Sequence, residues 1–176
     1  MRTKISFMKK GRERSTPNPS IAIGEAIAHL QEVKSALGKG PYSRDTIAKA
    51  LGHKLLTGPA ARKIAALAHY NLLERRGDAY FLSPLSEEIL HPLSEEQKSA
   101  AMKKAAKSPR LFAKLISKFR GQGLPSMLDN ILMRENISSN SASEVAKIFT
   151  RTLEEAGLIV NGIIMDEAES LEESTG

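Results

Sequence analysis

The chain contains no cysteine and no tryptophan among its 176 residues, and only 5% of its residues are aromatic. Without cysteine it can form neither disulfides nor thiolate zinc sites, and it has no cysteine nucleophile. So few aromatic rings argue against a platform on which single-stranded bases stack. The four histidines are scattered without metal-binding spacing, and no glycine-rich phosphate loop occurs. We therefore expect no catalysis, no metal and no cofactor.

Long apolar runs are also absent. No stretch approaches the roughly 20 apolar residues that cross a membrane as a helix. The first residues, Met1 to Arg14, are basic but lack the apolar run that follows the charges in a secretory signal. We expect a cytoplasmic protein that does not contact a membrane.

Positive charge, in contrast, is plentiful and unevenly distributed, with a formal net charge of +6. The basic start of the chain and the five acidic residues in 166–176 nearly cancel. The excess lies in residues 34–82, with nine Lys or Arg against three acids, and in residues 98–120, with eight basic residues and no acid. A basic surface favours phosphate-bearing partners, although an ordinary solvated surface is the alternative.

The first half has a helical period followed by a hairpin pattern. Apolar residues recur at three- and four-residue steps from Ile23 to Leu37, which predicts an amphipathic helix. Ser43 and Thr57 are predicted to cap a short second helix and a third helix that tolerates Pro59 in its first turn. Two β-compatible runs in residues 72–82 flank a polar turn and predict a hairpin, and a further helix follows through residue 90.

The second half is also predicted to be helical, over residues 94–107, 109–119, 125–134 and 141–156. A small hairpin is expected around Asn161-Gly162, a dipeptide typical of tight hairpin turns. The fold class is therefore mostly α. We predict a basic flexible arm (1–19), a first domain (20–91), a helical C-terminal domain (92–165) and an acidic disordered tail (166–176).

The predicted order of helix, short helix, turn, helix and hairpin resembles the winged helix-turn-helix superfamily. Residues 46–52 resemble the first helix of the helix-turn-helix pair, residues 60–73 the recognition helix, and residues 80–84 the exit from the wing. Asn71 departs from the usual glycine, and the turn over residues 53–58 is longer than the tightest examples. The whole chain further resembles a prokaryotic family catalogued as a domain of unknown function, which implies this architecture and no activity.

The second half either repeats the winged helix in a degenerate form or resembles it by chance. Four of its residues echo four residues of the first half in the same order: Leu153, Gly157, Leu158 and Ile159 beside Leu67, Asn71, Leu72 and Leu73. Two amphipathic helices can share so few residues by chance, so both interpretations stay open.

The resemblance implies that the third helix enters a DNA groove and that the wing contacts the DNA backbone. With Ala60, Ile64 and Leu67 facing inward, the 100° step per residue predicts which residues face outward. The candidate DNA-binding residues on this face and on the wing are Thr57, Pro59, Arg62, Lys63, Ala66, His69, Arg75 and Arg76.

These residues predict binding to double-stranded DNA, as a transcriptional regulator or as an accessory of a mobile-element or defence locus. Such modules often act as dimers, and the C-terminal half is the expected homodimerisation element. The alternative is a protein-interaction adaptor that uses the winged helix as a scaffold. A third and less favoured reading is an accessory of a nuclease or kinase with no active site of its own.

Overall fold

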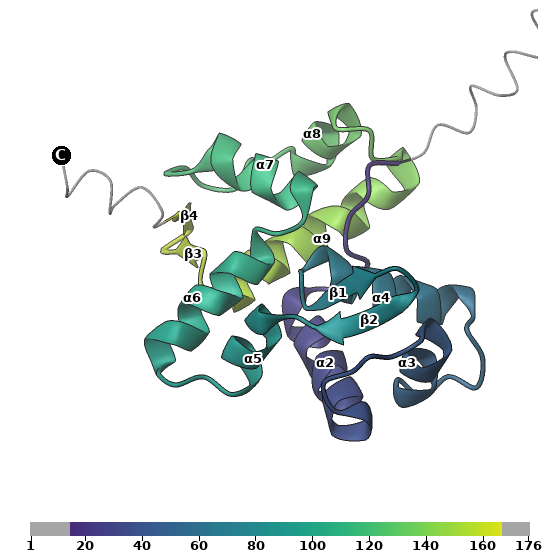
Figure 1. The fold of residues 1–176 in the computed structure, drawn as a ribbon. Coiled ribbons are helices and arrows are strands. Elements are labelled where there is room, and N and C mark those ends of the chain that lie inside the picture. Colours follow the sequence, from purple (N-terminus) through teal and green to yellow (C-terminus); the bar gives the residue numbers. More distant parts are fainter. Residues whose placement is uncertain (1–14, 167–176) are drawn as a thin grey trace, which may run out of the picture.

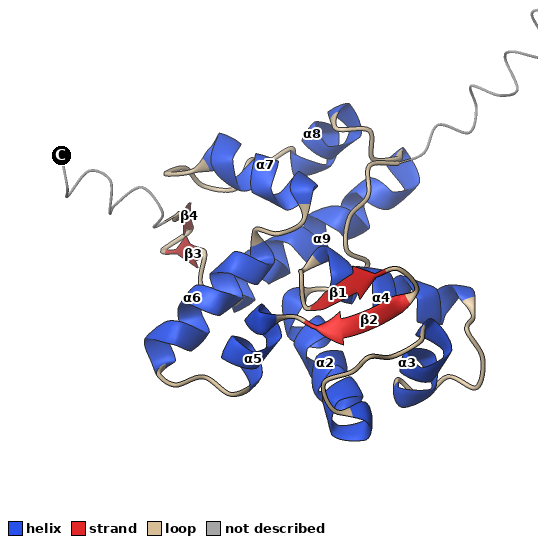
Figure 2. Ribbon diagram, viewed as in Figure 1, coloured by secondary structure: helices blue, strands red, loops and turns tan. Residues whose placement is uncertain are grey.

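The computed structural model describes residues 15–166, and the predictions for residues 1–14 and 167–176 lie outside that range. Eight helices and two small antiparallel hairpins make up the described chain (Figures 1 and 2), which confirms a mostly helical fold. In chain order the elements are α2 (Ile23–Leu37), α3 (Arg44–Ala50), α4 (Gly58–His69), β1 (Leu73–Arg76), β2 (Ala79–Leu82), α5 (Pro84–Leu90), α6 (Glu95–Ala106), α7 (Arg110–Phe119), α8 (Leu128–Arg134), α9 (Ser139–Glu155), β3 (Ile159–Val160) and β4 (Ile163–Ile164).

The helix starts in the first half follow the predicted caps. The hydroxyl of Ser43 accepts a hydrogen bond from the backbone N–H of Thr46, and that of Thr57 accepts from Ala60. Each cap satisfies a backbone donor that has no partner inside its helix. Asn71, directly after α4, has a φ of 58°, the left-handed conformation in which asparagine replaces the glycine usual there.

Both hairpins turn at the predicted residues. Gly77 has a positive φ at the first position of the β1–β2 turn, and Asn161 and Gly162 both have positive φ in the β3–β4 turn. Each hairpin also pairs with a residue from an earlier loop. Tyr42, between α2 and α3, bridges Tyr80 of β2, and Gly123, between α7 and α8, bridges Ile163 of β4.

The two halves therefore share one order of elements, with α2, α3, α4 and β1–β2 corresponding to α7, α8, α9 and β3–β4. The three helices of each set are followed by a residue with positive φ. These residues are Gly38, Gly52 and Asn71 in the first half and Gly121, Asn136 and Gly157 in the second. The same C-terminal hydrogen bond closes α4 (Leu72 N to Leu67 O, 2.9 Å) and α9 (Leu158 N to Leu153 O, 2.8 Å).

One continuous core joins the halves, although the predicted boundary near residue 91 falls in the turn between α5 and α6. In Figure 1, α9 lies in the centre of the molecule, between α7 and α8 and the α2–α4 group. The buried rings of Tyr70, Phe112 and Phe149 bring α4, α7 and α9 together, with ring centroids 6.3 and 5.1 Å apart. Aromatic contacts of this kind stabilise a core beyond the area they bury.

A buried polar network crosses the same junction. The Tyr70 hydroxyl donates to the carbonyl of Ile21 (2.8 Å) and lies 3.0 Å from the Thr152 hydroxyl, which accepts from the N–H of Ile23 (3.3 Å). Burial raises the pKa of Tyr70, and the nearby Glu155 carboxylate raises it further, although the hydrogen bond to Thr152 lowers it in part. Every polar group in the network has a partner, as a low-dielectric core requires.

Two predicted tail boundaries are wrong. Residues 15–19 were expected to belong to a flexible arm, but Thr16 donates through its hydroxyl to Glu135 O (2.7 Å) and through its backbone to Asn136 O (3.2 Å), and Pro19 is buried. The segment crosses from the α8–α9 turn towards α2 (Figure 1). At the other end, Asp166 forms an ion pair with Lys107 at 2.9 Å. Partners in the distant C-terminal half order both ends, so local composition could not reveal them.

Candidate nucleic-acid interface

The helix pair α3–α4 presents the start of α4 to solvent. Thr57, Gly58 and Pro59 are exposed, and the Thr57 hydroxyl is engaged as the cap, 3.4 Å from Ala60 N. Pro59 occupies the first turn, where its missing N–H costs no helical hydrogen bond. None of these three residues has a bulky side chain. Another molecule can therefore come close to the backbone N–H groups at this end of α4.

The exposed face of α4 consists mostly of small residues and carries one exposed cation. Arg62 is exposed between the small residues Ala61, Ala65 and Ala68, of which the last two are also exposed. The Arg62 guanidinium has no hydrogen bond or ion pair with the described residues, so its five donors remain available to a partner. A face of this kind lets a helix backbone come close to a surface while one long side chain reaches into it.

The predicted orientation of Ala66 is wrong, because Ala66 is fully buried. Arg62, Ala66 and Tyr70 form one ridge of α4 at four-residue spacing. The segment before α2 lies along this ridge, since Ser20 donates to the carbonyl of Arg62 (3.4 Å) and Ile21 accepts from Tyr70. The segment that covers Ala66 lies outside α4, so the apolar residues of α4 alone could not reveal it. Their periodicity therefore predicted that Ala66 faces solvent.

Lys63 and His69 lie at the flanks of the exposed face, and both are half-buried. The Lys63 ammonium donates a hydrogen bond to Nε2 of His53, in the turn before α4, at 3.0 Å. Burial lowers the pKa of His69 below its ordinary value. His69 is therefore neutral at neutral pH and adds a polar contact rather than a positive charge.

The β1–β2 hairpin, which corresponds to the predicted wing, presents Arg75 and Arg76 at its tip, and both side chains are exposed. The register places them there, because Arg76 pairs with Ala79 directly beside the Gly77-Asp78 turn and Arg75 pairs with Tyr80 one position further away. Of the eight predicted candidates, five lie at exposed or half-buried positions of α4 and its cap, two lie exposed at the tip of the β1–β2 hairpin, and Ala66 alone is enclosed.

Three further cations lie exposed on α3 and in the turn after it: Arg44, Lys49 and Lys54. All three belong to the basic block of residues 34–82, whose charge alone does not show which surface they occupy. Their exposure depends on which face of α3 packs against α4, with Ile47 and Ala48 buried. The signal that could have found them is the spacing of Arg44 and Lys49 relative to those two apolar residues.

The second basic block, over residues 98–120, does not form one open surface. Lys107 pairs with Asp166 at 2.9 Å, Lys114 pairs with Glu135 at 2.6 Å, and Lys118 lies 5.6 Å from the ring centroid of Phe119. These partners neutralise part of its charge, so the interpretation of a solvated face is the better one for this block.

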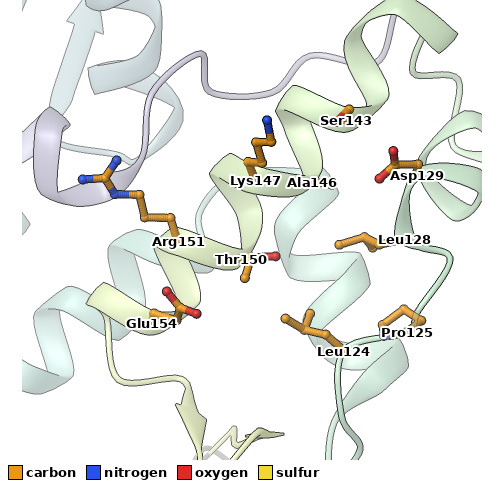
Figure 3. Close-up of a pocket in the computed structure, with 10 residues that line it drawn as sticks. All are labelled: Leu124, Pro125, Leu128, Asp129, Ser143, Ala146, Lys147, Thr150, Arg151 and Glu154. Carbon is orange, nitrogen blue, oxygen red and sulfur yellow. The ribbon is translucent and has the colours of Figure 1, made fainter.

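A cleft of about 560 Å³ lies between α8, the loop before it and α9 (Figure 3). Its apolar floor includes Leu124, Leu128 and Ala146, Thr150 points into it, and Lys147 and Arg151 of α9 also line it. Residues 15–166 bring together no group of three His, Asp or Glu side chains that would hold a metal ion. Every helix in that range is too short or too polar to span a membrane.

Comparisons with protein-family models, with curated protein sequences and with solved structures found no match for this chain. The function is therefore argued from the geometry of the surface described above.

Proposed function

We propose that the chain is a duplex-DNA-binding protein, with residues 20–91 as a winged helix-turn-helix whose α4 enters a DNA groove. The single observation that carries the proposal is the exposed face of α4, on which the Arg62 side chain stands exposed among small residues. An α-helix fits the major groove, and arginine is the side chain that most often reads guanine there. A transcriptional regulator is the role that suits such a module.

The charges around α4 support the same proposal. Arg44, Lys49 and Lys54 lie exposed on the neighbouring helix and turn, and Arg76 lies exposed beside the turn of the β1–β2 hairpin. Cations around an inserting helix neutralise phosphates of the DNA strands that border a groove. Tyr42 forms an isolated antiparallel bridge with Tyr80 of β2, which ties the loop between α2 and α3 to the hairpin.

We further propose that the second half is a reduced winged helix that does not read DNA. Its element order and hairpin bridge match those of the first half. When Asn71 and Gly157 are placed in register, the positions of Arg62 and Lys63 are occupied by Ile148 and Phe149, which are buried. The α9 helix is consequently committed to the core and has no cations left at the equivalent positions.

Fluorescence anisotropy of a labelled random-sequence duplex tests the proposal. Wild-type affinity should fall with rising salt, with a log–log slope of about −0.9 for each phosphate neutralised. Arg62→Ala should weaken binding by about 1–3 kcal/mol if Arg62 reads a guanine, and relax preference at one base pair. The matched control is Arg134→Ala on the exposed side of α8, which should bind like the wild type. Equal affinity of all three proteins would contradict the proposal.

A protein adaptor is the second candidate, and the cleft beside α9 is the observation that favours it. Docking through Ala66 or Tyr70 is not available to such an adaptor, because both residues are buried inside the chain. An adaptor would instead use the apolar floor formed by Leu124 and Leu128, and its partner would be lost when Leu124→Glu blocks that floor while duplex binding stayed unchanged.

A further inference from the structure

The two adjacent arginines of the wing make different contacts. Arg75 Nε donates to the carbonyl of Gly77 at 2.8 Å, and its guanidinium lies 3.8 Å from the carboxylate of Asp78. Both partners belong to the turn of the hairpin itself. Arg75 is therefore folded back on the turn, where its side chain stabilises the loop.

Arg76 projects from the opposite face of the hairpin, because side chains alternate along a strand. The register places Glu74 opposite Phe81, so Glu74, Arg76 and Phe81 share this face. The guanidinium carbon of Arg76 lies 5.0 Å from the ring centroid of Phe81, and its Nη2 lies 3.7 Å from Glu74 Oε2. The first distance is within the range of a cation–π contact.

The donors of Arg76 remain available despite these contacts. A separation of 3.7 Å is too long for a hydrogen bond, and Arg76 has no side-chain hydrogen bond to another described residue. Its side chain is 72% exposed. The ring beneath and the carboxylate beside it thus hold the guanidinium in one place without consuming its N–H groups.

We propose that Phe81 is a positioning residue that holds Arg76 for a contact with a DNA phosphate, and that Arg75 stabilises the turn and makes no such contact. The inference rests on the proposed function and assigns the wing contact to one side chain. A free arginine loses rotamer entropy when it binds, so a guanidinium already supported by a ring loses less. The wing then acts through one prepared cation rather than through a pair.

Duplex affinity and its salt dependence test the assignment. Arg76→Ala should lower affinity about tenfold and reduce the log–log salt slope by about 0.9, the contribution of one phosphate. Arg75→Ala, the matched control, should change affinity less than about twofold and leave the slope unchanged. Phe81→Leu should lower affinity about two- to fivefold, while Phe81→Trp, which keeps a stronger aromatic face, should retain it.

A double-mutant cycle separates positioning from a contact made by Phe81 itself. In the Arg76→Ala background, Phe81→Leu should have no further effect on affinity. An equal loss with and without Arg76, or an equal loss from Arg75→Ala and Arg76→Ala, would overturn the assignment. Urea unfolding of each variant shows whether it is folded at the temperature of the binding assay. A wild type that binds no duplex would overturn the proposed function itself, whereas binding that is indifferent to Arg76 overturns only this inference.

Discussion

Helices α4 and α9 occupy the same place in the order of elements of the two halves, but their surroundings differ. With Asn71 and Gly157 in register, the flank of α4 carries Arg62 and Lys63, and the flank of α9 carries Ile148 and Phe149. The first pair is exposed or half-buried, and the second pair is buried against the rest of the molecule. One order of elements thus supports an outward helix in one half and a central helix in the other.

The comparison shows that topology alone does not define a binding surface. The residues at two positions decide whether the helix is buried. Burial of apolar side chains stabilises the fold, whereas burial of a cation without a partner is costly. The α9 helix also contributes Thr152 and Glu155, which satisfy the backbone N–H groups of Ile23 and Gly24 at the start of α2. We therefore regard the second half as the support that holds the first half in position.

The largest expected effect comes from the ring that links the halves. Phe112→Ala should reduce the free energy of unfolding by about 3–5 kcal/mol, because it leaves a cavity between Tyr70 and Phe149. Circular dichroism during urea unfolding should still show one transition, as expected for a shared core. Two separate transitions would show that the halves fold independently and would break the comparison.

Two neighbouring alanines of α4 provide the next test. Ala66→Leu should cost about 1–3 kcal/mol of stability, since Ala66 is fully buried under the segment before α2. Ala65→Leu adds the same side chain to the exposed face and should change stability by less than about 0.5 kcal/mol. Thermal unfolding measures both. If Ala65→Leu were the more damaging substitution, the described orientation of α4 would be wrong.

Substitutions of Glu155 and Glu154 distinguish the capping of α2 by α9 from a general effect of negative charge on α9. The Glu155 carboxylate accepts from Gly24 N at 2.6 Å, where a helix N-terminus has unpaired N–H groups. Glu155→Ala should cost about 0.5–2 kcal/mol, as the loss of an N-cap does. Glu154 is exposed, and Glu154→Ala should stay within about 0.5 kcal/mol of the wild type in the same denaturation assay. Equal losses would remove the capping role.

The smallest expected effect concerns the cleft of the second half. Thr150 stands at the position that Ile64 fills in the first half, and Thr150 is only half-buried at the edge of the cleft. Thr150→Ile should raise the free energy of unfolding by about 0.5–1 kcal/mol, because it adds apolar area where α8 and α9 separate. Chemical denaturation checks this gain. A loss of stability would mean that the cleft needs its hydroxyl, which would favour the adaptor candidate.

Local sequence signals were sufficient for most elements of the described chain. Ser43, Thr57 and Ser83 accept hydrogen bonds as caps, and Asn161-Gly162 makes the turn of the second hairpin, because these interactions involve residues no more than a few positions apart. Ser94 also caps its helix by accepting from Gln97 N, and the Gln97 side chain accepts from Leu93 N.

The candidate site was predicted less completely. The exposed Arg62 and the two wing arginines follow from the periodicity of α4 and the position of the hairpin turn. Three features could not be predicted from the sequence: the burial of Ala66, the contact of Arg75 with its own turn, and the ring of Phe81 beneath Arg76. Each depends on a partner whose direction is set by packing or by a strand register rather than by spacing along the chain.

By itself, the sequence determined the secondary structure, the positions of the turns and the basic character of the first half, since these depend on short-range backbone interactions and on composition. Only the tertiary structure decided which faces remain available. Thr16 reaches the α8–α9 turn, Ser20 and Ile21 cover one ridge of α4, and Thr152 and Glu155 cap α2 across the molecule. Contacts between residues 42 to 131 positions apart leave no period in the sequence, because each depends on where the whole chain has placed its partner.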